Sequence, residues 1–197
     1  MKIAILAAFL GVLADILLLH EPTAVYERMD YQFLATKPLS HILLGHYLGV
    51  LVIPFELLGL WAIVDKIRTN ETIKVWLRFC LAFVLSAGIV YHGAIIFVAH
   101  ILQKAPQIPV NELTIYFEPL GTLLAVVFLG LCVGLSILQK KDKIDLPKSL
   151  FWLNPAFIYL LTVLVYLIYP PLGRYLVVAG FNLSIGTYLL AVKVVKW

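Results

Sequence analysis

The residues of this sequence that could do chemistry are acids and histidines that interrupt long apolar segments. Asp15, His46 and His92 each lie inside such a segment, as do Glu56 and Glu118. A charged side chain at the centre of a membrane helix costs roughly 2.5–3.5 kcal/mol, so ionisable residues there are functional candidates. We therefore take Asp15, Glu56 and Glu118 as candidate catalytic residues.

Asp15, His46 and His92 have the residue types of a catalytic zinc site, where three protein ligands leave one position open for water. A zinc ion would lower the pKa of that water and polarise an ester or amide carbonyl. The sequence lacks the H-x-x-x-H and H-E-x-x-H pairs of helical zinc sites. A zinc-dependent intramembrane hydrolase is one hypothesis.

A second hypothesis needs no metal. An acid buried in an apolar pocket has a raised pKa and can exchange protons with a substrate. Such a group would suit an isomerase or cyclase that acts on a hydrophobic or lipid-like molecule. Tyr91 and Tyr166 lie deep in the apolar segments, and Asn154 stands at a break before Pro155. These three residues are expected to line the substrate cavity with His46 and His92.

Other roles use the same residue types. Chains of Asp, Glu and His relay protons in membranes, so proton-linked transport or ion conduction is the alternative functional class. A transport path needs ionisable groups on both sides of the membrane centre, and among the candidate residues Glu56 alone lies towards the inner side. Haem would need two histidines at matched depth, such as His46 and His100. With no chemistry at all, the histidines would hydrogen-bond across helices and hold them together.

The elements that must position these residues are membrane helices. The chain of 197 residues is 62% hydrophobic and 13% charged, with a mean hydropathy of +0.99. Soluble domains have about 45–50% apolar and about 25% charged residues. A span needs about 20 apolar residues. The sequence predicts an all-α, polytopic transmembrane helical bundle, one domain over residues 1–197, with six spans at about 3–19, 42–64, 79–102, 115–138, 150–169 and 172–192.

The basic residues predict the orientation. Eleven of the fifteen lysines and arginines lie near the two termini or in segments 65–78 and 139–148. Because such residues concentrate in cytoplasmic loops, both termini are predicted to be cytoplasmic, in a multi-pass inner-membrane protein. The histidines and most candidate acids then fall in the outer half of the membrane, with Glu56 at the floor of the cavity. The expected partners are membrane lipids, a hydrophobic small molecule and a second copy of the chain, and not nucleic acid.

Several short motifs carry a resemblance. They are Gly45-His46-Tyr47-Leu48-Gly49, the following Ile53–Trp61 segment, Tyr91-His92-Gly93, and Gly11 with Asp15. Together they resemble a family of uncharacterised bacterial six-span membrane proteins of unknown function. The resemblance implies a bacterial inner-membrane protein and six spans, and it implies no activity.

Overall fold

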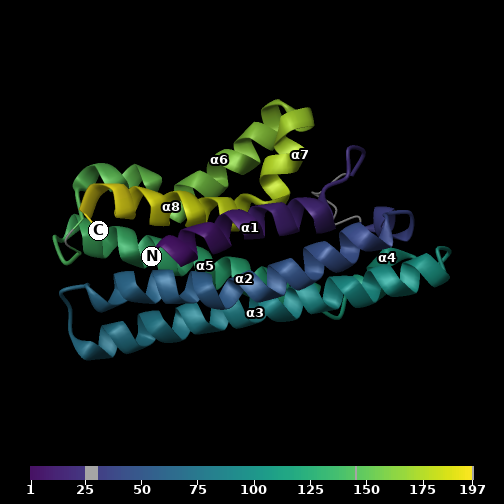
Figure 1. Ribbon diagram of the computed structural model, residues 1–197. Helices are drawn as coiled ribbons and strands as arrows, with labels where there is room; N and C mark the ends of the chain where they lie inside the picture. Colours follow the sequence, from purple (N-terminus) through teal and green to yellow (C-terminus); the bar gives the residue numbers. More distant parts are fainter. Residues whose placement is uncertain (25–30, 145, 197) are drawn as a thin grey trace.

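The computed structural model describes residues 1–24, 31–144 and 146–196 and is built from helices (Figure 1). In the part described there is no β-strand, and Ile67 and Ile144 form an isolated bridge. The predicted all-α class is confirmed. The helices are α1 (Lys2–Leu19), α2 (Leu39–Asp65), α3 (Glu71–Lys104), α4 (Val110–Thr114), α5 (Glu118–Lys140), α6 (Pro155–Ile168), α7 (Pro170–Val178) and α8 (Gly180–Lys196), with 3₁₀ helices η2 (Gln32–Ala35) and η3 (Lys148–Leu153).

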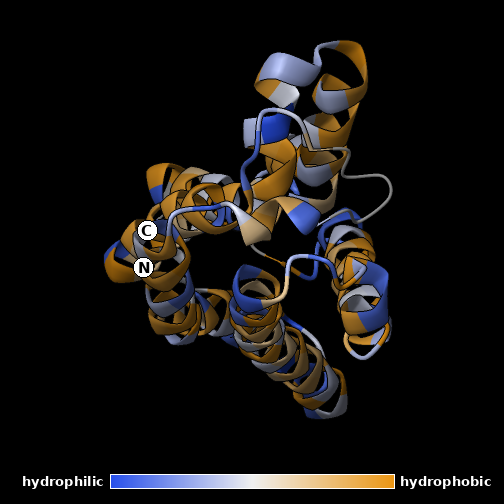
Figure 2. Ribbon diagram, turned by 90° about the vertical axis from the view of Figure 1, so that its right-hand side faces the viewer, coloured by the Kyte–Doolittle hydropathy of each residue, from blue (hydrophilic) through white to orange (hydrophobic). Residues whose placement is uncertain are grey.

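Four helices, α1, α2, α3 and α5, are each long and apolar enough to cross a membrane, and the bent pair α7–α8 makes five if it counts as one span. Figure 2 shows hydrophobic residues, in orange, along much of the length of the helices. Six uniform spans are therefore not confirmed. The predicted fifth span is divided between η3 and α6, whose 14 residues reach only about 21 Å of the roughly 30 Å that hydrocarbon requires.

Prolines begin three of the helices. Proline lacks a backbone N–H and is tolerated in the first turn of a helix, so Pro155 begins a new helix inside the predicted fifth span, and Pro170 begins α7 in the predicted turn before the sixth. The predicted sixth span bends by 73° between α7 and α8, at Ala179, with no proline at the bend. The predicted fourth span likewise starts at Glu118, where Pro119 occupies the first turn of α5.

Loop contacts define the two ends of the bundle. At one end the N–H of Arg68 donates to the carbonyl of Lys143 at 2.5 Å, which joins the α2–α3 loop to the segment after α5. We call this the basic end. At the opposite end Gln103 Nε2 donates to the carbonyl of Lys37 at 2.8 Å. Figure 1 shows both termini at the basic end.

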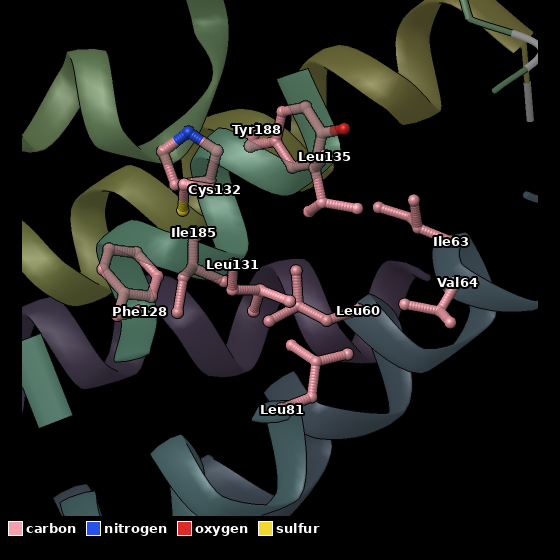
Figure 3. Close-up of a pocket in the computed structure, with 11 residues that line it drawn as sticks. Leu60, Ile63, Val64, Leu81, Phe128, Leu131, Cys132, Leu135, Ile185 and Tyr188 are labelled. Carbon is pink, nitrogen blue, oxygen red and sulfur yellow. The ribbon is translucent and has the colours of Figure 1, made fainter. Parts of the chain in front are cut away.

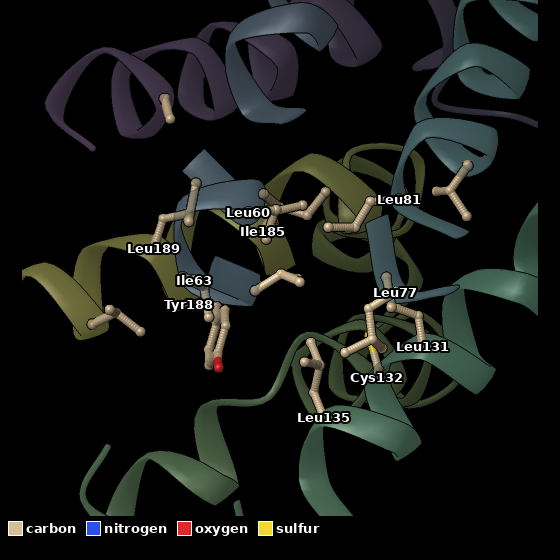
Figure 4. Packing of buried hydrophobic residues seen from close by; sticks show 14 of the residues in the cluster. Leu60, Ile63, Leu77, Leu81, Leu131, Cys132, Leu135, Ile185, Tyr188 and Leu189 are labelled. Carbon is tan, nitrogen blue, oxygen red and sulfur yellow. The ribbon is translucent and has the colours of Figure 1, made fainter. Parts of the chain in front are cut away.

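The apolar core forms two clusters. The larger lies among α2, α3, α5 and α8 and includes Leu60, Leu131 and Ile185 (Figure 4). It leaves a gap of about 10 Å³ among mainly aliphatic side chains (Figure 3), which is room for about one water but offers it too few polar partners. The smaller cluster, around Leu18 and Leu34, lies towards the opposite end.

Candidate functional site

A cavity of about 320 Å³ touches both apolar clusters and is lined by residues of every α-helix except α4. Ligand pockets are commonly about 300–1,000 Å³ and mainly apolar, with a few polar groups that fix the ligand. This cavity fits that description. Its polar lining groups are Asp15, Tyr31, Tyr91, His92, Tyr159 and Asn182.

Asp15 is the centre of the polar wall. It is 5% exposed and lies on α1. Its Oδ1 is 3.3 Å from Nε2 of His92 on α3, and its Oδ2 accepts a hydrogen bond of 2.7 Å from Nδ2 of Asn182 on α8. Three helices far apart in the sequence therefore meet at one carboxylate, which accepts a hydrogen bond from an amide and lies beside an imidazole.

The His92 ring occupies the space that a side chain at Gly49 of α2 would fill. A Cβ atom at Gly49 would lie 2.5 Å from Cε1 and 2.7 Å from Nδ1 of the His92 ring. Nδ1 is buried and has no hydrogen-bond partner among the described residues. The imidazole therefore faces Asp15 through Nε2 and the α2 backbone at Gly49 through Nδ1 and Cε1. Both Asp15 and His92 line the cavity.

His46 hydrogen-bonds across helices. Its Nδ1 lies 3.1 Å from the carbonyl oxygen of His92, and His46 does not line the cavity. In the described part of the chain no three His, Cys, Asp or Glu side chains are grouped as metal ligands would be. The structure thus joins Asp15 and His92 and leaves the third predicted zinc ligand outside that pair. His100, the other predicted haem ligand, is exposed on α3.

Two tyrosine hydroxyls form a second polar group on the wall. Tyr31 Oη and Tyr91 Oη are 3.0 Å apart, and the Tyr91 ring packs edge-on against Phe117. Burial raises the pKa of Tyr31, and nearby Tyr91 and Glu118 raise it further. The Tyr31 hydroxyl therefore stays protonated and able to donate. Glu118 acts on this pair through its charge and does not itself line the cavity.

Glu56 lies behind the cavity wall. It is 0% exposed, and neither carboxylate oxygen has a hydrogen-bond partner among the described residues. A Cβ atom at Gly11 would lie 3.0 Å from Glu56 Oε1 and 2.8 Å from Asn182 Nδ2. The side chains of Glu56 and Asn182 therefore lie side by side next to Gly11. Asn182 is thus close to Glu56 and also bonded to Asp15.

Asn154 and Tyr166 do not line the cavity. Asn154 accepts from the N–H of Ala156 at 3.0 Å, which caps α6, and its Nδ2 donates to the carbonyl of Cys132 at 3.0 Å. Tyr166 packs its backbone directly against Gly173 of α7. Both residues position α6, which contributes Tyr159 to the wall.

Asn182, Tyr31 and Tyr159 were missed as site residues because the sequence search followed ionisable groups inside the spans. Asn182 had a usable signal, since an amide inside an apolar helix generally hydrogen-bonds across helices. Tyr31 had none, because its position on the wall depends on how the segment before α2 folds back.

The profile of a family of unknown function, DUF6796, matches residues 1–196. The chain belongs to this family. The match confirms the predicted relationship to an uncharacterised family and assigns no activity. No curated protein and no solved structure matches the chain.

Proposed function

We propose that this protein is an intramembrane enzyme that transfers a proton on a hydrophobic, lipid-like substrate bound in the cavity. The observation that carries the proposal is Asp15, held by His92 and Asn182 in the wall of a mainly apolar cavity. A carboxyl group in such a place exchanges protons efficiently with a bound molecule when the geometry is fixed.

The wall suggests a role for each polar group. Asp15 removes a proton from a substrate carbon and returns it at another carbon, while His92 and Asn182 hold the carboxyl in position. The Tyr31–Tyr91 pair donates a hydrogen bond to a substrate oxygen where negative charge develops. An isomerisation of this kind is balanced without a further reactant. It is favoured over the zinc hydrolase because His46 bonds to a backbone carbonyl.

The experiment uses heavy water, because the substrate is unidentified. Purified protein is incubated in D₂O with a total bacterial lipid extract, and mass spectrometry measures deuterium fixed at carbon. We expect incorporation into one lipid class, reduced about 100-fold or more in Asp15→Asn. A wild-type protein that fixes no deuterium and changes no lipid would overturn the proposal.

A matched pair of glycines tests the cavity itself. Gly88 lines the cavity, and a Cβ there would meet only Ile53 Cδ1, at 3.5 Å, among the described atoms. Gly93 lies on the same helix with no described atom within 4 Å of its Cβ position. Gly88→Leu is expected to abolish lipid binding and deuterium incorporation, and Gly93→Leu to retain both.

We also propose six membrane crossings, with α6 and the bent α7–α8 pair as the last two, in the bacterial inner membrane. Both termini would be cytoplasmic. Support comes from the excess of lysine and arginine at the basic end, where the termini also lie. A periplasmic reporter, alkaline phosphatase, fused to the C-terminus should be inactive, and an active fusion would overturn this orientation.

Proton-linked transport is a second candidate because of Glu56. A buried carboxyl that has no hydrogen-bond partner in the described part of the chain, close to Asn182 and so linked to Asp15, resembles one step of a proton path. Reconstituted vesicles with a pH gradient distinguish the two functions. Proton uptake that Glu56→Gln abolishes, without deuterium fixed in lipid, would favour transport.

A further inference from the structure

A groove of about 470 Å³ lies at the basic end, where α5 ends and η3 begins. Its lining residues are Gln139, Lys140, Lys148, Phe151 and Trp152. None of them lines the Asp15 cavity. The groove is therefore a separate site, and the proposed enzyme activity does not account for it.

The end of α5 gives this groove a fixed backbone. The N–H of Asp142 donates to the carbonyl of Gln139 and that of Lys143 to the carbonyl of Leu138, at 3.1 and 2.9 Å. This is a Schellman cap, which requires a left-handed residue, and Asp142 has φ of 54°. The buried Gln139 side chain also donates to the carbonyl of Pro147 at 2.8 Å. Together these bonds hold η3 against the last turn of α5.

Aromatic rings form one side of the groove. Lys140 Nζ lies 4.8 Å from the centroid of the Phe151 ring, and Phe151 packs edge-on against Trp152. Trp152 is 71% exposed and also contacts Phe157. Exposed tryptophan beside lysine is typical of the membrane–water interface, where the ring faces acyl chains and the ammonium group faces headgroups.

Lys148, the second lysine of the groove, forms a weak ion pair. Lys148 Nζ lies 3.3 Å from Asp142 Oδ1, and both side chains are more than 70% exposed. Exposed ion pairs of this kind contribute little stability, so Lys148 can exchange Asp142 for a stronger acceptor. Lys140 has an aromatic ring as its described partner. Two lysines thus face one groove with one weakly bound acid between them.

We propose that this groove binds the headgroup of an anionic phospholipid. The phosphate contacts Lys140 and Lys148, and an acyl chain lies along Trp152 and Phe157. The charge of the groove selects an anionic headgroup, and its aromatic side selects a lipid over a free anion. Each lysine near an anionic lipid surface contributes affinity of roughly fivefold.

The test compares two double variants of equal charge. Lys140→Gln/Lys148→Gln removes the groove lysines, and Lys141→Gln/Lys143→Gln removes two exposed neighbours that do not line the groove. The full chain is placed in nanodiscs containing phosphatidylglycerol and phosphatidylcholine, and native mass spectrometry counts the lipids that remain after delipidation. We expect the groove variant to lose phosphatidylglycerol by about 25-fold, and the control variant to retain it.

Equal losses in both variants would mean diffuse attraction to the surface and would overturn the proposal, as would no preference for phosphatidylglycerol in the wild type. Displacement of the lipid by inorganic phosphate would indicate an anion site instead. Asp142→Asn, which keeps a side chain tolerant of positive φ, should bind the lipid more tightly because it releases Lys148. Deuterium incorporation should be unchanged in the groove variant, which separates this test from that of the enzyme.

Discussion

Glycines have opposite surroundings on α2 and on the C-terminal part of α5. A Cβ atom at Gly45 of α2 would lie 2.8 Å from the backbone of Ala14 and Leu18 on α1. Gly49 of the same helix receives the ring of His92. On α5, a Cβ atom at Gly121 would lie 2.7 Å from the Tyr91 ring, whereas Gly130 and Gly134, further along the helix, have no described atom within 4 Å of the Cβ position. The same residue type therefore marks close packing on α2 and an open face on the C-terminal part of α5.

This difference explains where the cavity lies. Small residues let helices approach closely in a membrane, and α1, α2 and α3 use them to bring Asp15 and His92 together. Helix α5 packs mainly on α3 and contacts α6 only sparsely. In the cavity, Asp15 of α1 and His92 of α3 face a lining that α5 supplies with apolar residues such as Leu124 and Phe128.

The largest loss of stability is expected at Gly45, where the backbones of α1 and α2 are in close contact. Gly45→Leu would drive a side chain into the α1 backbone, which cannot move aside, so the fold should lose about 3 kcal/mol or more. Thermal unfolding in detergent and gel filtration measure this loss. Gly134→Leu is the matched change on α5 and should be close to neutral. Equal destabilisation by Gly45→Leu and Gly134→Leu would show that α2 and the C-terminal part of α5 do not differ in packing.

A smaller change at Gly49 should separate activity from stability. Gly49→Ala displaces the His92 ring and lengthens its contact with Asp15, so deuterium incorporation should fall at least about tenfold. Nitrogen NMR of the imidazole should report the altered Nε2 environment. Gly130→Ala is the control and should leave both readings unchanged. Normal activity in Gly49→Ala would remove His92 from the proposed mechanism.

Two buried asparagines offer a third comparison. Asn182→Leu leaves an oxygen of Asp15 without its donor, and Asn154→Leu leaves the carbonyl of Cys132 without one. Each should cost about 1–3 kcal/mol of stability, because a buried polar group is left unpaired. Only Asn182→Leu should also reduce deuterium incorporation, measured per folded protein. Equal loss of activity in both would mean that Asn182 acts through the fold alone.

The smallest effect concerns the joint between α1 and α7, where His20 stacks on Tyr175 with ring centroids 3.6 Å apart. Burial, and then nearby Lys37, lowers the pKa of His20 below 6.5. Below pH 6.5 the unfolded chain binds this proton more readily than the folded one, so stability falls as the pH falls. His20→Phe keeps a stacked ring, and its melting temperature should depend less on pH in that window. An unchanged pH dependence would contradict this assignment.

Much of the site could be predicted from residue type. An acid or histidine in an apolar helix is costly, so Asp15 and His92 were recognisable as partners in a polar layer. Their depth followed from the helical rise along each span. Asn182 escaped because an uncharged amide costs less and gives a weaker signal, and Tyr31 because its position depends on the path of a loop.

The sequence by itself determined that the chain is helical and apolar enough for a membrane, since backbone polar groups in lipid must be satisfied within each helix. It also placed the basic residues at one end. Only the tertiary structure decided that Asp15 pairs with His92 and Asn182 while His46 contacts a carbonyl, and that the segments predicted as the last two spans are divided into shorter helices. The reason is that helix rotation and tilt are set by packing between pairs of surfaces, such as Gly49 against His92, and no single segment encodes both members of a pair.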